Sequence, residues 1–144
     1  MQKSETGQVR ILLVDDHDAI RESWKFFLEK NSRFIVVGQC SNGRDAIAMA
    51  QQILPDIILM DINMKIVNGF EATRQIVQSN PETGIIGITI NNHPGYASKM
   101  LELGARGFVT KSSSFSELTM AILKVHAGET YVCEEIDIDK TPQR

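Results

Sequence analysis

The sequence predicts an α/β domain built on a doubly wound parallel sheet. Short apolar segments alternate along the chain with longer segments in which apolar residues recur every three or four positions, and these are the patterns of buried strands and amphipathic helices. About five such units follow one another, and right-handed helical crossovers between parallel strands cover both faces of a sheet. The alternation therefore predicts a five-stranded parallel sheet with helices on either side.

The first unit contains the central strand. The nearly continuous apolar run VRILLV at residues 9–14 is typical of a strand that is buried on both faces. A helix follows, with Asp18 as its N-cap and its end near Lys30. Trp24 lies on the apolar face of this helix, so we expect its side chain in the core.

The second and third units have clear turn signals. Strands are expected at residues 34–37 and 57–60, where the sequence is apolar and short. Asn-Gly pairs open the helices that follow, and proline ends them. The opening pairs are Asn42-Gly43 and Asn68-Gly69, and the closing residues are Pro55 and Pro81.

The last two units have the same form. Strands are expected at residues 85–90 and 108–110. A helix begins at His93-Pro94-Gly95 and ends near Gly104, and serines 112–114 cap the final helix, which Gly128 ends.

Length, composition and charge are those of one ordinary globular domain. The 144 residues are 42% hydrophobic and 23% charged, values that exclude disordered and fibrous classes. The formal net charge of -3 provides no positive field for a phosphate backbone, so we expect no autonomous binding of nucleic acid. We expect a disordered segment at residues 1–8, the domain at 9–130, and a linker stub at 131–144.

Cysteine usage and hydropathy predict a cytoplasmic protein that does not contact a membrane. Cys40 and Cys133 form no Cys-x-x-Cys pair, so we expect buried, reduced thiols rather than a zinc site or a disulfide. No apolar run approaches the roughly 20 residues of a membrane span, and the polar first residues do not resemble a signal peptide.

Polar side chains follow most of the predicted strands at the point where each strand ends. The carboxyl ends of parallel strands meet at one edge of an open α/β sheet, where ligands bind. That edge would gather Asp15, Asp16, Asp61, Thr89 and Lys111. Carboxylates about 4 Å apart repel one another by roughly 4 kcal/mol at an effective dielectric of about 20, so the cluster favours a cation. Mg²⁺ prefers oxygen ligands and often shares its site with phosphate, and we expect it here.

The absence of nucleotide-binding motifs limits the reactions that this acidic cluster is expected to support. No Gly-x-Gly-x-x-Gly or Walker loop follows the first strand, which disfavours a nucleotide held at a helix N-terminus. A carboxylate beside a metal ion and a lysine is suited to attack phosphorus and form an aspartyl phosphate. A Mg²⁺-dependent phosphohydrolase is a less favoured alternative, because its second carboxylate would replace Asn63, two residues after Asp61.

Four segments at strand ends resemble the motifs of receiver domains of two-component response regulators. These segments are VDDHD at 14–18, ILMDINM at 58–64, GITI at 87–90 and GFVTK at 107–111. The runs VVGQCSNGRDA at 36–46 and LGARGFVTK at 103–111 resemble the NarL/FixJ subfamily, whose members usually carry a LuxR-type helix-turn-helix after the receiver.

The resemblance implies a flavodoxin-like strand order, 2-1-3-4-5, and a role for each acidic residue. Asp61 would accept a phosphoryl group from a histidine kinase. Mg²⁺ would be bound directly by Asp16 and Asp61, through water by Asp15, and by the backbone carbonyl of Asn63.

The resemblance also implies a conformational switch rather than an enzyme, with self-phosphorylation and slow autodephosphorylation as its only reactions. Lys111 would pair with the phosphoryl group, and Thr89 would donate a hydrogen bond to it. Phe108 would then turn inward behind Thr89. The switch would control an output, expected to be transcription through a C-terminal DNA-binding domain that this chain does not contain.

Self-association and a phosphorylation-independent role remain open at this point. A homodimer is expected either through the fourth helix, fifth strand and fifth helix or through the first and fifth helices. Tyr96, Met120 and Leu123 lie off the apolar stripes and are candidates for a partner surface. An interaction domain that works without phosphorylation is the alternative function.

Three positions depart from the pattern of the family or border the site. Lys65 stands where a proline is usual, which should loosen the loop after Asp61. Ile90 is larger than the usual alanine or glycine and is expected to crowd the phosphoryl group. Asn91 is a candidate for modulating phosphoryl hydrolysis.

Overall fold

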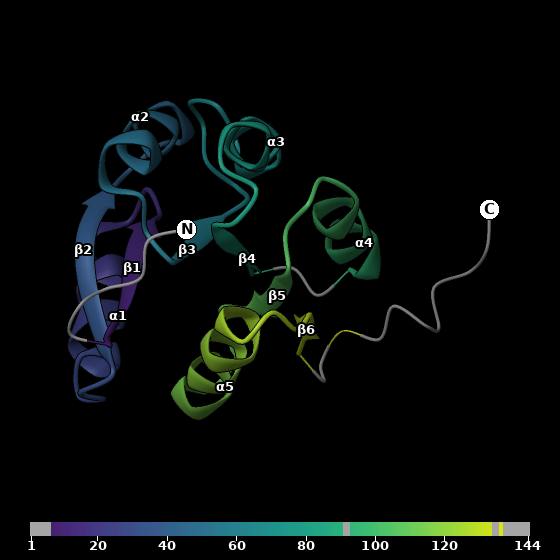
Figure 1. Cartoon of the computed structure of the whole chain (residues 1–144). Helices are drawn as coiled ribbons and strands as arrows, with labels where there is room; N and C mark the ends of the chain where they lie inside the picture. Colours follow the sequence, from purple (N-terminus) through teal and green to yellow (C-terminus); the bar gives the residue numbers. More distant parts are fainter. Residues whose placement is uncertain (1–6, 91–92, 134–135, 137–144) are drawn as a thin grey trace.

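The computed structural model describes residues 7–90, 93–133 and 136. Within these residues six parallel strands form one sheet in the order β2-β1-β3-β4-β5-β6 (Figure 1). The strands are β1 (Val9–Val14), β2 (Phe34–Cys40), β3 (Ile57–Asp61), β4 (Gly84–Thr89), β5 (Gly107–Thr110) and β6 (Tyr131–Val132). The predicted doubly wound architecture and the order 2-1-3-4-5 are therefore confirmed, with a sixth strand added at one edge.

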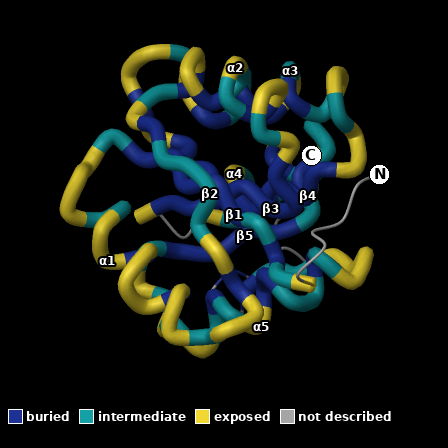
Figure 2. Tube along the Cα trace, turned by 60° about the vertical axis from the view of Figure 1, so that its left-hand side comes forward, coloured by how far each residue is buried: buried dark blue, intermediate teal, exposed yellow. Residues whose placement is uncertain are grey.

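Five helices connect the described strands and cover both faces of the sheet. They are α1 (Asp18–Leu28), α2 (Gly43–Ile53), α3 (Gly69–Ser79), α4 (Pro94–Glu102) and α5 (Phe115–His126). Figure 2 shows the buried strands between α2 and α3 on one side and α1 and α5 on the other. The rings of Phe27 and Phe115 stack with their centroids 4.3 Å apart, and this contact joins α1 to α5.

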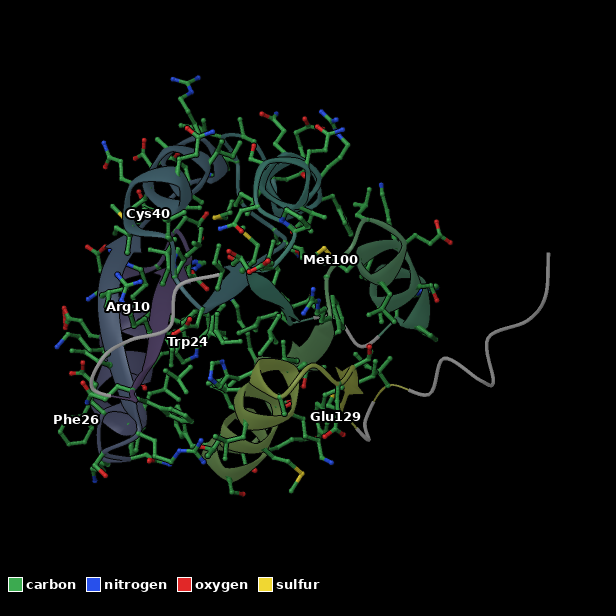
Figure 3. The ribbon with its side chains drawn as sticks, in the orientation of Figure 1. Arg10, Trp24, Phe26, Cys40, Met100 and Glu129 are labelled. Carbon is green, nitrogen blue, oxygen red and sulfur yellow. The ribbon has the colours of Figure 1, made fainter. Side chains whose placement is uncertain are left out.

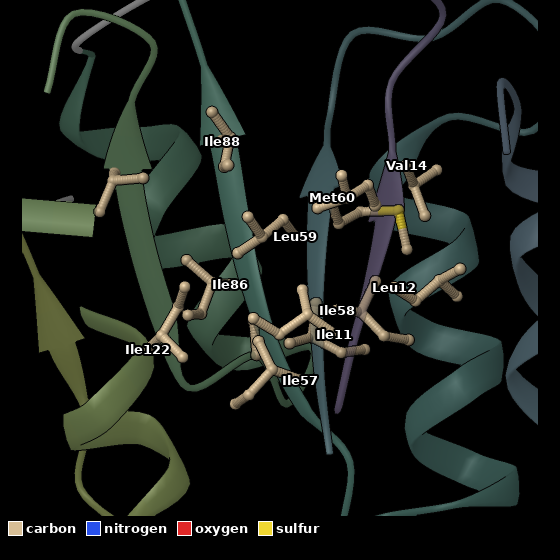
Figure 4. Close-up of a cluster of buried hydrophobic side chains, with 14 of the residues drawn as sticks. Ile11, Leu12, Val14, Ile57, Ile58, Leu59, Met60, Ile86, Ile88 and Ile122 are labelled. Carbon is tan, nitrogen blue, oxygen red and sulfur yellow. The ribbon is translucent and has the colours of Figure 1, made fainter. Parts of the chain in front are cut away.

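The core is centred on β1, β3 and β4, whose apolar side chains are buried on both faces (Figure 4). Ile11, Ile58 and Ile86 are fully inaccessible to solvent. Trp24 is buried as predicted and points inward from α1 (Figure 3). Phe27, on the same helix, lies at the rim and is 41% exposed.

Side-chain caps fix the beginnings of three helices at the predicted positions. The side chains of Asn42, Asn68 and Ser114 each accept a hydrogen bond from a backbone N–H in the first helical turn, which stabilises a helix start by about 1 kcal/mol. The prediction for α1 was wrong by one residue. Its N-cap is His17, and the Asp18 carboxylate instead accepts a hydrogen bond from Arg21 in the following turn.

The segment after α5 corrects the expected linker. Tyr131 and Val132 form β6, which pairs in parallel with β5, and the side chains of Cys133 and Ile136 are buried. A two-residue strand is too short to show any periodicity in the sequence. Of the segment 1–8 that was expected to be disordered, residues 1–6 lie outside the described part of the chain, as do Asn91 and most of the remaining expected linker.

No helix in the described part of the chain is long and apolar enough to cross a membrane.

Candidate functional site

The polar residues predicted to meet at the carboxyl edge of the sheet do meet there. Asp15 follows β1, Asp61 and Thr89 are the last residues of β3 and β4, and Lys111 follows β5. The parallel registers of β1 with β3 and of β3 with β4 bring these ends to the same level. The topology alone therefore places Asp15 and Asp61 on adjacent strands.

The carboxylates form a compact cluster with little access to solvent. Ligand atoms of Asp15, Asp16, His17 and Asp61 all lie within 4.8 Å of one another, and the Asp15 and Asp61 side chains are buried. Burial raises the pKa of Asp61, and the negative charges of Asp15 and Asp16 raise it further. A backbone hydrogen bond from Asn63 and the charge of Lys111 oppose this rise in pKa without cancelling it.

Lys111 supplies the positive charge that faces the cluster. Its ammonium lies 2.8 Å from Asp15 Oδ2 and 3.5 Å from Asp61 Oδ2, and the side chain is 14% exposed. The backbone N–H of Lys111 donates a 2.7 Å hydrogen bond to the carbonyl of Thr89. The lysine is thus anchored to β4 while its charge reaches the ends of β1 and β3.

The cluster carries more negative than positive charge. Within the described residues, Asp16 Oδ1 is buried and accepts no hydrogen bond, although the imidazole Nδ1 of His17 lies 3.0 Å away. Three carboxylates face one ammonium group, so negative charge remains unbalanced. Oxygen donors in this number suit a hard divalent metal ion, and the acidic cluster can bind a metal.

Backbone hydrogen bonds hold the two central carboxylates in place. The N–H of His17 donates to Asp15 Oδ1 at 2.8 Å, and the N–H of Asn63 donates to Asp61 Oδ1 at 3.0 Å. Gly69, at the start of α3, passes so close to Asp61 that a Cβ atom there would lie 2.5 Å from its carbonyl oxygen. One oxygen of each carboxylate is therefore held by a backbone N–H of its own loop, while the other faces the Lys111 ammonium.

Phe108 is already buried in this structure. A Cβ at Gly87 would lie 2.8 Å from the Phe108 ring and 2.8 Å from the Met100 methyl group, so the glycine creates the space that the ring fills. Thr89 is also fully buried. The Phe108 ring thus lies inside the protein, against Gly87 of β4.

Comparison with known proteins decides the family. The sequence model of the response regulator receiver domain matches residues 11–123. The chain belongs to this family. The receiver domain contains all the strand ends that form the site, from Asp15 to Lys111.

The similarity to NarL/FixJ-type regulators is also confirmed. The chain is 34% identical to response regulator GacA of Pseudomonas viridiflava over 128 residues, which are 89% of this chain and 60% of that protein. A LuxR-family two-component response regulator from Aurantimonas sp. SI85-9A1 superposes with a TM-score of 0.89 at 34% identity, covering 92% of this chain and 96% of that one. The signal receiver domain of the putative response regulator NarL from Mycobacterium tuberculosis superposes with a TM-score of 0.79 at 28% identity, covering 85% of this chain and 98% of that one. The chain spans about three fifths of the curated relative that it matches.

Three findings at the border of the site differ from the sequence analysis or go beyond it. Ile90, which was expected to crowd the phosphoryl group, is 77% exposed. The ring of His17, a residue given no role from the sequence, contacts both acids of the pair. Arg21 was not identified at all, and its guanidinium donates to the backbone carbonyl of Asp15. No sequence motif marks this arginine, since its contact is with a backbone atom.

Proposed function

We propose that this receiver domain takes a phosphoryl group from a phosphohistidine of a histidine kinase onto Asp61, in a reaction that requires Mg²⁺. The observation that carries the proposal is the position of Asp61. Its carboxylate is buried at a strand end, next to two further carboxylates and 3.5 Å from the Lys111 ammonium. A receptor for small molecules or a structural module has no need to concentrate these charges.

The transfer needs a nucleophile and a way to neutralise charge. An oxygen of Asp61 attacks phosphorus, the P–N bond to the histidine breaks, and the imidazole nitrogen keeps the electron pair. Mg²⁺, when bound, offsets the negative charge of the phosphoryl oxygens and of the carboxylates. The residues that would hold it are Asp16 and Asp61 directly, Asp15 through water, and Asn63 through its backbone carbonyl.

Lys111 and Thr89 complete the site in this proposal. The Lys111 ammonium would pair with the new phosphoryl oxygens, because they add charge beside a lysine that already faces Asp61. The Thr89 hydroxyl would donate a hydrogen bond to the phosphoryl group. Phe108, packed over Gly87 behind the end of β4, would stabilise the position of Thr89 that makes this bond.

The domain would act as a signalling switch whose own chemistry ends with gain and slow loss of this phosphoryl group. Relatives that extend beyond the length of this chain support an output in a following domain, and we propose transcription through a helix-turn-helix that contacts DNA. The receiver would occupy residues 9–130, with the chain continuing through β6. The free buried thiols of Cys40 and Cys133 support a reducing, cytoplasmic location.

For self-association, the most exposed of the described aromatic side chains favours α1 and α5 over α4, β5 and α5. Phe26 is 63% exposed at the outer edge of α1 (Figure 3), beside the Phe27 ring that stacks on Phe115. In contrast, β6 covers the outer edge of β5. Sedimentation of the Phe26→Ser variant with beryllofluoride should show less dimer than wild type, whereas an equal dimer fraction would argue for the other face.

Intact-mass measurement after incubation with acetyl phosphate and Mg²⁺ tests the acceptor. Wild type should gain the mass of one phosphoryl group, and the Asp61→Asn variant should gain none. Asp56→Asn is the matched control, because Asp56 is a buried carboxylate at the opposite end of β3, and this variant should be labelled like wild type.

Two results would contradict the proposal. Labelling of Asp61→Asn would place the acceptor elsewhere. An unmodified wild type, under conditions that label another receiver domain, would favour an interaction domain that works without phosphorylation.

A further inference from the structure

Arg21 is the most extensively bonded charged side chain that borders the acidic cluster without belonging to it. Its guanidinium uses all three nitrogens. Nε donates to Gln39 Oε1 at 3.3 Å, one terminal nitrogen donates to the backbone carbonyl of Asp15, and the other pairs with the Asp18 carboxylate. The side chain is only 13% exposed, so its charge is largely withdrawn from water.

These contacts join three elements at the point where the acidic loop begins. Gln39 belongs to β2, Asp18 is the first residue of α1, and Asp15 directly follows β1. The packing of α1 across β1 and β2 brings the guanidinium to this junction (Figure 1). A planar group with several donors in fixed directions can bridge such acceptors, whereas a lysine ammonium is a single point of charge.

The peptide groups on both sides of Asp15 are fixed as a result. The N–H of Asp15 donates to the carbonyl of Cys40 at 3.2 Å, and the carbonyl of Asp15 accepts from Arg21. That carbonyl belongs to the peptide that leads into Asp16. The orientation of this peptide sets the direction in which the Asp16 side chain leaves the backbone.

Asp16 is the residue whose direction matters for a cation. Its Oδ1 atom is buried and accepts no hydrogen bond in the described structure, and no backbone N–H anchors its carboxylate as His17 and Asn63 anchor those of Asp15 and Asp61. The side chain of Asp16 is therefore directed by the backbone beneath it and by the His17 ring, whose Nδ1 lies 3.0 Å from Oδ1.

We propose that Arg21 is a positioning residue for Mg²⁺ binding, which holds the Asp15–Asp16 peptide so that the Asp16 carboxylate points into the cluster. The inference rests on the proposed function, since it assumes that Mg²⁺ is the cation of this site. Residues that orient metal ligands typically change affinity by about 10- to 100-fold when they are replaced. Arg21 does so through a backbone carbonyl and never touches the metal.

The test compares Mg²⁺ affinity, measured by calorimetric titration, in wild type and three variants. Arg21→Gln should weaken binding by at least about 10-fold. The Mg²⁺ affinity of Arg21→Lys should lie between those of wild type and Arg21→Gln, because one ammonium cannot hold all three acceptors at once. Arg74→Lys is the matched control: Arg74 forms the same i,i+3 pair with Glu71 on α3 but lies outside the cluster, and this variant should bind Mg²⁺ like wild type.

A second readout separates positioning from a general structural role. The rate of labelling by acetyl phosphate is measured against Mg²⁺ concentration. In Arg21→Lys the half-saturating Mg²⁺ concentration should rise while the rate at saturating Mg²⁺ stays that of wild type. A purely structural role would lower the saturating rate through loss of folded protein and leave the half-saturation point unchanged, and that result would overturn the inference.

The outcomes also distinguish this inference from the proposed function. Wild type that binds no Mg²⁺ would reject the proposed function itself. Wild type that binds Mg²⁺, with equal affinity in Arg21→Gln, would reject only the role of Arg21. If Arg21→Gln does not fold, as judged by circular dichroism, the comparison of Arg21→Lys with Arg74→Lys decides in the same way.

Discussion

The Asp61→Asn substitution should make the metal-free domain more stable. Oxygens of Asp15, Asp16 and Asp61 lie within 4.8 Å of one another, and two unit charges at that distance interact by about 3.5 kcal/mol at an effective dielectric of about 20. Asp61 therefore experiences two repulsions of this size. The attraction to Lys111 across 3.5 Å recovers about 4.7 kcal/mol on the same scale, which is less than the two repulsions together.

The net cost of ionised Asp61 is thus about 2 kcal/mol before its burial is considered. Asp16 is partly open to solvent, with 27% of its side chain exposed, which reduces the repulsion, so we expect Asp61→Asn to raise the free energy of unfolding by about 1 to 2 kcal/mol. The asparagine oxygen can still accept the hydrogen bond from Asn63. Lys111 keeps its closer partner, Asp15.

The effect has a definite dependence on pH and on Mg²⁺. Because the pKa of Asp61 is raised above its ordinary value of 3.8, the ionised form destabilises the fold, and wild type regains stability as the pH falls through the folded-state pKa. The difference in the free energy of unfolding between wild type and Asp61→Asn is therefore largest at neutral pH and becomes smaller as the pH falls toward 3.8. Mg²⁺ at about 100 times its dissociation constant should stabilise wild type by about 2.7 kcal/mol and reverse the order.

Urea unfolding in EDTA and in Mg²⁺, followed by Trp24 fluorescence, measures these differences. Trp24 is the single tryptophan, and it lines a small cavity together with Lys111. Asp56→Asn is the control, because this carboxylate accepts a 2.9 Å hydrogen bond from the Arg10 backbone N–H and its replacement should not stabilise. An Asp61→Asn variant that is no more stable than wild type in EDTA at neutral pH would refute the electrostatic reasoning.

Three further substitutions test the packing that supports the site. Leu59→Ala in the fully buried centre of β3 should lower the free energy of unfolding by about 3 kcal/mol, and a loss below about 1 kcal/mol in urea would mean that the strand is less tightly packed. Gly87→Ala should cost about 1 to 3 kcal/mol, because the new Cβ would meet the Phe108 ring at 2.8 Å; unchanged aromatic chemical shifts of Phe108 would contradict the contact. Tyr131→Phe removes the 2.9 Å hydrogen bond from the tyrosine hydroxyl to Glu117 and should lower the free energy of unfolding by about 1 kcal/mol. Thermal unfolding of this variant, of Glu117→Gln and of the double variant tests the contact, because the two losses of stability should not add.

Local signals predicted most of the fold. Asn42, Asn68 and Ser114 cap their helices as expected, because a side chain that accepts from the third following N–H needs no other part of the protein. Asp18 has the same chemistry but did not cap, since Arg21 one turn later takes its carboxylate. Competition between two local partners is not visible in a pattern of residue types.

Features that depend on pairing across the sheet were harder to predict. The second strand was expected at residues 34–37 but continues to Cys40, because β1 offers partners along its whole length. In the same way, β6 exists only because β5 has a free edge beside it. Such residues adopt strand geometry in response to a neighbour rather than through their own hydrophobic pattern.

The acidic site was predictable because its residues lie at strand ends, and the topology of parallel strands determines which ends meet. The side chains that orient them were not predictable. Arg21 acts on a backbone carbonyl, and Gly87 acts by leaving space for Phe108. Neither contribution depends on a reactive group, so neither produces a recognisable motif.

The position of β6 gives the site a physical connection to the end of the described chain. β5 has only four residues. Beyond its last residue, Thr110, the Lys111 N–H donates to the Thr89 carbonyl, and within the strand the Phe108 carbonyl accepts a hydrogen bond from the Cys133 N–H at 3.0 Å. The residues of this short strand pair with β4 on one side and with β6 on the other. A shift of Thr89 and Lys111 toward charge at Asp61 would therefore also displace the backbone to which β6 is bonded. The chain that follows α5 is in this way attached to β5, the strand that leads into Lys111.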